Sequence, residues 1–216
     1  IALNTAMQAG ALKAKQRNQL LKDMTEAVRA KVLRNNYLQS QAISVMHHKA
    51  RERLGEQWEL IRLLERDANL DRRLEALPDE KALEARQTAG MGLTRPEIAV
   101  LLSYAKIDLF KELLASDVPE DPYLSKELLR YFPEQLTDTY GDVLTEHPLK
   151  REIIATRITN SLINRMGATF AHRLHEEIGA GLGNIARAYT IARDVYQITP
   201  LWKRIESLDS RISAEL

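Results

Sequence analysis

The chain has 216 residues, of which 44% are hydrophobic and 28% charged, so it is long enough to bury one large core or two smaller ones. Its 31 Lys and Arg residues almost balance its 30 Asp and Glu residues, and a net charge of +1 gives no electrostatic reason to expect nucleic acid or an anionic membrane surface as a partner. The absence of cysteine excludes disulfides, thiolate catalysis and Cys-ligated zinc, and it fits a reducing compartment, so we expect a cytoplasmic protein.

No apolar run approaches the roughly 20 residues that are needed to span a bilayer, so we expect no membrane partner. Residues 1–10 lack the basic start and the apolar block of a signal peptide. Because the chain begins at Ile1 rather than Met, we expect native sequence upstream, and therefore a fragment or a processed chain.

Helical periodicity dominates the sequence. Only 9 glycines and 7 prolines occur, and no sustained alternation of apolar and polar residues marks a strand, so we predict an all-α, multi-helix bundle. In the first part, three apolar stripes at three- and four-residue steps predict buried helix faces: Leu21, Met24, Val28 and Val32; Leu38, Ala42, Val45, Met46 and Leu54; Trp58, Ile61, Leu64 and Ala68.

A proline and two acids, Pro78-Asp79-Glu80, predict the start of a helix that runs through Arg86. Two glycines then follow in the segment 89–92, which is the best candidate hinge in the chain. We therefore predict two packed helical subdomains, residues 1–89 and residues 90–216.

The second half opens with a capping box, because Thr94 is followed three residues later by Glu97, with Pro96 in the first turn. The helix that it begins should bury Ile98, Leu101, Leu102, Ala105, Leu109 and Leu113. A turn over 117–122, a short helix that ends before Pro133 and a less regular stretch around Gly141 follow.

A long helix is predicted from Pro148 to about Ile178, with Gly179 as its left-handed cap. Its buried residues should be Ile154, Ile158, Leu162, Phe170 and Leu174, and its small residues Ala155, Gly167, Ala168 and Ala171 would allow a neighbouring helix to approach closely. Asn184 should cap the next helix, which would bury Ile185, Ala188, Ile191, Ala192 and Val195. Pro200 should separate that helix from a final amphipathic piece with Leu201, Trp202, Ile205 and Leu208.

One glycine-rich segment, 179–183, leads into a helix as a phosphate-binding loop does. The dinucleotide fingerprint needs Gly-x-Gly-x-x-Gly after a buried strand, whereas this spacing is one residue short and follows a long helix. We therefore predict a helix–helix connection here, and no bound cofactor.

Histidines supply the nearest approach to a metal site. His172 and His175 are three residues apart beside Glu176 and Glu177, and two imidazoles at that spacing can share a metal. No third ligand is evident, so we interpret the pair as surface histidines near a helix C-terminus, where cationic groups are favoured. The rings of His47-His48 point to different faces of a helix, which makes them a weaker candidate.

The remaining candidates are too common to assign chemistry. The basic residues Lys13, Lys15, Arg17 and Lys22 lack interleaved aromatic rings, so we predict a solvated helix face rather than a nucleic-acid site. Lys106 near Asp108 is an ordinary charge pair. From the residues alone we assign no catalytic, cofactor-binding or metal-binding residue.

Four blocks carry a resemblance to a known family. These are the run from Gly92 to Lys106, the run Glu152–Arg157 with Thr159-Asn160, the run Ile185–Tyr189, and Asn35-Asn36-Tyr37 with Gln41. In order and approximate spacing they resemble the C-terminal region of the large bacterial NAD-specific glutamate dehydrogenases, and the resemblance covers essentially the whole chain.

The resemblance implies a parent reaction in which glutamate, NAD and water give 2-oxoglutarate, ammonia and NADH. In that family the catalytic lysines and aspartate and the glycine-rich NAD loop lie upstream, so it carries no catalytic role onto any residue here, and we expect the fragment alone to be inactive. Its implied partners are the upstream catalytic domain and further copies of the chain in a homo-oligomer. Three roles stay open for the fragment: bracing the catalytic cleft, linking subunits, and regulation. The alternative is that the chain is a free-standing helical adaptor without enzymatic ancestry.

Overall fold

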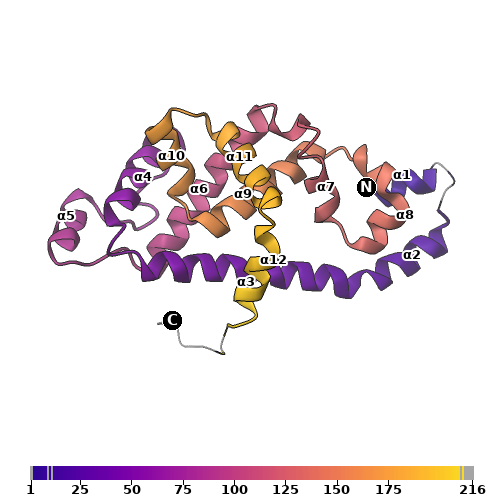
Figure 1. Ribbon diagram of the computed structural model, residues 1–216, viewed down its shortest axis with the longest axis horizontal. Coiled ribbons are helices and arrows are strands. Elements are labelled where there is room, and N and C mark those ends of the chain that lie inside the picture. Colours follow the sequence, from indigo (N-terminus) through magenta and orange to yellow (C-terminus); the bar gives the residue numbers. More distant parts are fainter. Residues whose placement is uncertain (1, 9, 11, 210, 212–216) are drawn as a thin grey trace.

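A computed structural model of the chain describes residues 2–8, 10, 12–209 and 211; Ile1, from which we expected upstream sequence, lies outside them. The described residues form helices joined by turns, with no strand among them, which confirms the all-α prediction (Figure 1). None of the helices within these ranges combines the length and apolar character that crossing a membrane requires.

Twelve α-helices and one 3-10 helix make up the described part of the chain. In chain order they are α1 (Ala2–Gln8), α2 (Ala14–Asp23), α3 (Thr25–His48), α4 (Leu54–Asp67), α5 (Glu80–Thr88), α6 (Arg95–Ala115), η1 (Val118–Glu120), α7 (Lys126–Tyr131), α8 (Glu134–Thr145), α9 (Lys150–Met166), α10 (Phe170–Ile178), α11 (Leu182–Val195) and α12 (Ile198–Glu206).

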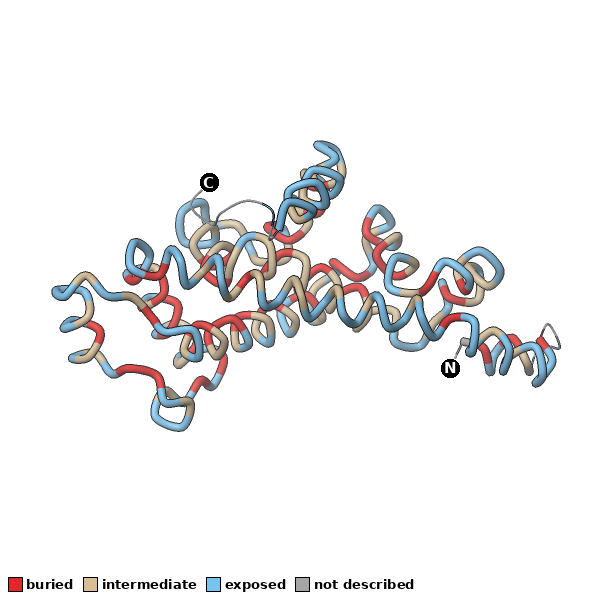
Figure 2. Tube along the Cα trace, turned by 90° about the horizontal axis from the view of Figure 1, so that it is seen from below, coloured by how far each residue is buried: buried red, intermediate tan, exposed pale blue. Residues whose placement is uncertain are grey.

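The main core is built around α6 and α9, with α4 packed against α6. Figure 2 shows buried and exposed stretches alternating along the helices, as expected of helices that each pack on one side. All six predicted residues of α6 are buried, and α9 contributes Ile154, Ile158 and Leu162 as expected. Residues before and after the segment 89–92 belong to this same apolar cluster. A smaller cluster lies at the other end of the molecule, where α1 packs on α8.

Close backbone approach constrains the segment that joins α5 to α6. A Cβ added at Gly92 would lie 2.4 Å from the carbonyl carbon of Ala50, so only glycine fits there without movement of the backbone. Gly90 has a φ of +65°, the left-handed value that glycine adopts freely at the end of a helix. The two glycines therefore hold this connection tightly against the turn that follows α3.

The start and end signals were partly right. The capping box of Thr94 and Glu97 is confirmed, and Gly179 is confirmed as a left-handed cap with a φ of +68°. The helix predicted from Pro78 begins at Glu80 instead, because Asp79 caps it by accepting a hydrogen bond from the Ala82 amide at 2.8 Å. The stretch around Gly141 is more regular than predicted, since it belongs to α8, which is kinked at Tyr140.

The long helix predicted from Pro148 to Ile178 is wrong, because the chain breaks into α9 and α10 at Gly167. Gly167 ends α9 with a φ of +89° and a ψ of 166°, which no L side chain adopts readily. Its neighbour Ala168 is fully buried, so the break directs the connection inward. Pro200 also differs from expectation, since it lies in the first turn of α12, where its missing N–H has no helical partner to lose.

Helix α3 runs along one side of the molecule and is largely exposed (Figure 1). Met24, its N-cap, and Ala42 are buried as predicted, as is Leu54 at the start of α4. Met46 is half-buried and packs against the main core. Leu21, Val28, Val32 and Val45 are between 42% and 53% exposed. The prediction that the stripes pack within the chain is therefore wrong for these four residues, and α3 and the end of α2 present apolar side chains outward.

Candidate functional site

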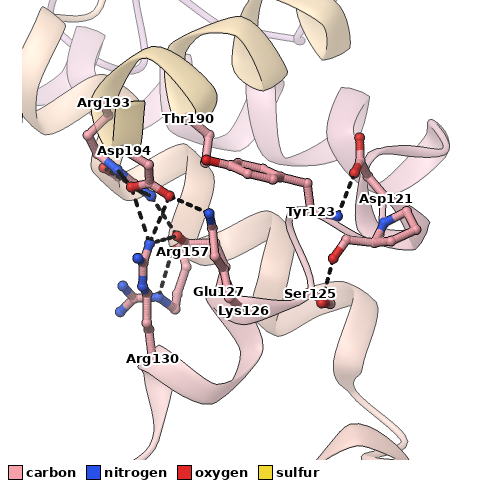
Figure 3. A network of polar contacts seen from close by, with 12 residues as sticks. Asp121, Tyr123, Ser125, Lys126, Glu127, Arg130, Arg157, Thr190, Arg193 and Asp194 are labelled. Atoms are coloured by element: carbon pink, nitrogen blue, oxygen red, sulfur yellow. Dashed lines mark hydrogen bonds and ion pairs between the residues drawn. The ribbon is translucent and has the colours of Figure 1, made fainter. Parts of the chain in front are cut away.

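A buried ion network joins α7, α9 and α11. The Glu127 side chain of α7 is completely buried, and three guanidinium groups converge on its carboxylate (Figure 3). Arg193 Nη2 and Arg130 Nη1 each donate to Oε1 at 2.6 Å, and Arg157 Nε donates to Oε2 at 3.2 Å. Because these arginines come from three different helices, one carboxylate fixes all three to one another.

A second carboxylate extends the network toward solvent. Asp194 accepts from Lys126 Nζ at 2.7 Å and from Arg193 Nε at 3.0 Å. Burial acts to raise the pKa of Asp194, but its bonds to Lys126 and Arg193 outweigh that effect and lower the pKa to about 2. The Lys126 ammonium also lies 3.3 Å from the centre of the Tyr123 ring, a cation–π contact.

The electrostatics make this network a structural device. Burial acts to raise the pKa of Glu127, yet the positive charges of Arg193 and Arg157 hold it below the usual value for a glutamate. A carboxylate held ionised in this way, with every oxygen engaged, is a poor proton acceptor for a reaction. The arrangement therefore fixes helix positions rather than performing proton transfer.

The network also decides which face of α11 points inward, and this corrects the prediction. Ile185 is buried as expected, but Ile191 is 40% exposed and Val195 is 65% exposed, while Thr190 and Arg193 are buried in their place. Arg193 must face Glu127 to keep their ion pair, so the helix turns its apolar residues outward. Asn184 does not cap this helix either, since α11 begins at Leu182 and Asn184 accepts from Arg187.

His172 lies in a different environment from the one we predicted. It is buried, with Nε2 only 3.2 Å from Asp108 Oδ2, whereas His175 is exposed and its Nδ1 lies 2.9 Å from the Ala180 carbonyl oxygen. The interpretation of His172 as a surface histidine is therefore wrong. In the described ranges no three His, Asp or Glu side chains come together as a metal site would need. That neither histidine binds a metal stays a prediction.

The other sequence candidates separate in space. Lys106 is half-buried on α6, and burial lowers its pKa to about 8. Lys13, Lys15 and Lys22 are exposed on or beside α2 as predicted, whereas Arg17 of the same set is half-buried. His47 and His48 are exposed at the end of α3. Gly179 and Gly181 cap the end of α10 and the start of α11, so the predicted helix–helix connection is confirmed.

Two hollows lie at the surface of the main core. One, of about 240 Å³, is lined by His172 together with residues of α4 and α10. The other, of about 290 Å³, lies between α3, α4, the α9–α10 connection and Trp202 of α12. The sequence did not indicate the second hollow, because it is assembled from segments more than a hundred residues apart.

Comparison with known proteins gives matches along the whole chain. The family model described as "Glutamate dehydrogenase, C-terminal" matches residues 90–216, and the one described as "Bacterial NAD-glutamate dehydrogenase, catalytic domain" matches residues 1–46. The chain is similar to proteins named NAD-specific glutamate dehydrogenase from three bacteria. It is 48% identical to the one from Pseudomonas aeruginosa and 43% identical to the one from Halomonas elongata, over the whole chain in both cases. With the Mycobacterium tuberculosis protein it shares 33% identity over 99% of the chain.

These relatives are much longer than the chain, which spans 13% of the length of each. The resemblance noted in the sequence is thereby confirmed. The match to a catalytic-domain model ends within α3, and the match to the C-terminal model begins two residues after the end of α5.

Proposed function

The chain belongs to the glutamate dehydrogenase C-terminal family, and we propose that it is the C-terminal helical part of a large NAD-specific glutamate dehydrogenase of the cytoplasm. The whole enzyme would convert L-glutamate, NAD and water to 2-oxoglutarate, ammonia and NADH. We assign this chain the task of bracing the catalytic domain.

The chain's own residues do not fit an NAD site. Dinucleotide folds place the pyrophosphate at a helix start directly after a buried strand. The glycine-rich segment 179–183 instead joins α10 to α11, and the glycines of the segment 89–92 likewise follow a helix, α5. We therefore assign NAD and the reacting groups to the rest of the polypeptide, and no step of the reaction to any residue here.

The outward face of α3 is the observation that carries the proposal. Val28 and Val32 of α3, spaced by four residues, are 45% and 52% exposed, and Leu21 near the end of α2 is 42% exposed. Contiguous apolar surface of this kind marks a face that another part of the protein covers. Because residues 1–46 match a catalytic-domain model, the rest of that domain is the partner we propose for this face.

The two parts of the chain would then have different tasks. Residues 1–89 would leave the catalytic domain and pack back on it, and residues 90–216 would form the C-terminal helical domain. The family models support this division, since their matches end at residue 46 and begin at residue 90. The shared apolar core would transmit the rigidity of α6 and α9 to α3.

The test replaces Val28 and Val32 by aspartate in the complete polypeptide. Two charges in a buried apolar interface should lower NADH formation from glutamate by at least about tenfold, because each desolvated charge costs more than the 1.4 kcal/mol that a tenfold effect requires. Leu74→Asp, at a side chain that is 78% exposed and lies outside the catalytic-domain match, is the matched control and should retain activity. Full activity in the double variant would refute the docking of α3.

The chain on its own should form no NADH from glutamate. Turnover by the isolated 216 residues at a rate near that of the complete enzyme would overturn the assignment of the reaction to the remaining sequence.

A second task, contact between subunits of a homo-oligomer, is favoured by the outward face of α11. Val195 and Tyr196 are 65% and 77% exposed beside Ile191, so this face is also apolar and uncovered within the described part of the chain. Val195→Asp should shift the complete enzyme to a smaller assembly in sedimentation, and an unchanged assembly would exclude this face from the subunit contact.

A further inference from the structure

The hollow beneath α12 has polar walls that come from four parts of the chain. The C-terminal part of α3 supplies Lys49 next to its end, α4 and the turn before it supply Gln57 and Arg53, and α9 supplies Asn164 and Arg165. Trp202 of α12 closes one side. Its volume of about 290 Å³ is at the lower end of the range for small-molecule sites.

Two carboxamides in this wall have unpaired oxygens. Gln57 is only 2% exposed, and its Oε1 is enclosed without a hydrogen-bond partner in the described structure; the same holds for Asn164 Oδ1. An enclosed acceptor without a partner destabilises a fold, so two of them in one wall call for a reason. Both residues line the hollow, so a rotation about the last bond of either side chain would bring its carbonyl oxygen within reach of a donor group of a ligand there.

The charged residues of the wall are all cationic in the part of the chain that the structure describes. Arg165 is paired with Glu206 at 2.5 Å and Arg53 with Glu56 at 3.3 Å, whereas Lys49 forms no ion pair with a described residue. The hollow therefore has about one uncompensated positive charge beside two neutral acceptors. That combination complements a ligand with one negative charge and a hydrogen-bond donor.

Polar contacts attach helix α12 over this hollow. No residue of α12 is buried, and the helix follows Gln197, which has a left-handed φ of +50°. Glu206 holds the helix to Arg34 and Arg165, and the Arg165 guanidinium lies 4.5 Å from the centre of the Trp202 ring. The Glu206 side chain is only 7% exposed, so opening of α12 must break its two ion pairs, whereas the other side chains of the helix leave positions that are at most partly buried. A cover over a binding site exchanges a small set of contacts of this kind when it opens.

We propose that this hollow binds a small organic carboxylate that also carries an amino or hydroxyl group, and that α12 closes over it. Lys49 and Arg53 bind the carboxylate, the carbonyl oxygens of Gln57 and Asn164 accept from the amino or hydroxyl group, and Trp202 excludes water. The site stands apart from the reaction assigned to the rest of the polypeptide, so it holds whether or not the proposed activity is correct.

Hydrogen exchange followed by mass spectrometry on the complete polypeptide tests the proposal, because it localises protection without depending on turnover. The probes are L-serine, L-glutamate, L-malate and inorganic phosphate, each at millimolar concentration. At least one of the three carboxylates should slow exchange in two segments together, residues 41–57 and residues 197–206. Slowing by none of them, or by phosphate alone, would overturn the proposal.

Two variants and one control complete the test. Lys49→Gln and Gln57→Leu should each raise the half-saturating concentration of the effective carboxylate about tenfold or more, the effect of losing one charge-assisted or buried hydrogen bond. Lys111→Gln, which removes an exposed charge on α6, should leave that concentration unchanged. Equal protection in all three variants would overturn the assignment of the site.

Folding does not confound the Gln57 variant. Replacing an unpaired buried amide by a leucine of similar size removes a polar group without a partner, so Gln57→Leu should match or exceed the natural chain in stability while binding the carboxylate more weakly. Suppose instead that Gln57→Leu lowers the stability of the chain and leaves its affinity for the carboxylate unchanged. Gln57 would then have a structural partner, and its proposed role in binding would be overturned.

Discussion

The two sides of α9 are held by different forces. On one side Ile154, Ile158 and Leu162, spaced by four residues, pack into the apolar core with α6. On the other, Arg157 and Ser161, also four residues apart, bind groups of α7 and α11 in the buried ion network. One helix therefore joins a region that apolar burial stabilises to a region that paired charges define.

The apolar contacts and the ion pairs differ in how much they stabilise the fold and in how strictly they fix the orientation of a helix. Apolar burial contributes about 25 cal/mol per Å² of surface removed from water and tolerates small rotations of a helix. A buried ion pair gives little net stability but opposes every arrangement that leaves a charge unpaired. The ionic side thus sets the rotation of α11, while the apolar side contributes most of the stability of α9 and α6.

Glu127→Gln is the sharpest way to break the ionic side, and we expect the largest effect from it. The buried Arg193 guanidinium would lose its charged partner, as would the partly exposed Arg130 and Arg157, and this should lower the free energy of unfolding by about 3–5 kcal/mol. Glu26→Gln, which removes the partner of Arg29 on the exposed face of α3, should change it by less than about 1 kcal/mol. Urea denaturation measures both variants, and similar effects in the two would show that the network does not behave as a buried one.

Ile158→Ala tests the apolar side in the same way. Truncating a fully buried isoleucine should lower the free energy of unfolding by about 2–5 kcal/mol through lost burial and the cavity that remains. Ile191→Ala on α11 is the matched control, and its 40% exposed side chain should make the loss much smaller. Equal losses would indicate that Ile191 is buried, and therefore that α11 has the orientation predicted from its sequence.

The smallest expected effect is on the pH dependence of the free energy of unfolding, to which the ionic side of α9 should contribute and the apolar side should not. The pKa of Asp194 is about 2 in the folded chain and about 4 in an unfolded one, so its contribution is present above pH 4 and is lost as the pH falls toward 2. Asp194→Asn should therefore flatten the fall in urea midpoint over that range. Asp138→Asn, at an exposed residue of α8, should leave the slope unchanged, and a slope equally steep in both variants would contradict the role of Asp194.

Helix α11 shows why part of the arrangement could not be predicted. Its apolar residues Ala188, Ile191 and Val195 follow helical spacing as well as its inward residues Ala186, Thr190 and Arg193 do, so periodicity alone favoured the wrong face. The competing face includes an arginine, and nothing local to α11 reveals a buried glutamate 66 residues earlier in the chain. Only the partner makes that arginine an inward residue.

The break at Gly167 has a similar explanation. Apolar spacing continues from Ile154 to Leu174 as if through one helix, and a single glycine inside a helical pattern is tolerated at a cost of about 1 kcal/mol. The chain turns here because Ala168 and Ala171 enter the core on a different path from α9. The hollow beneath α12 escaped prediction for the same reason, since its walls meet only after this turn is made.

The sequence by itself determined that the chain is helical, where α4, α6 and α7 lie, and which residues of α6 and α9 form the core. Those properties depend on residues within a few positions of one another, where helical spacing, caps and prolines act directly. The tertiary structure alone decided the rotation of α11, the outward face of α3 and the hollow between α3, α4 and α12. Each of these depends on contacts between residues that are distant in the chain, and the sequence of a single helix does not show which other helix will cover it.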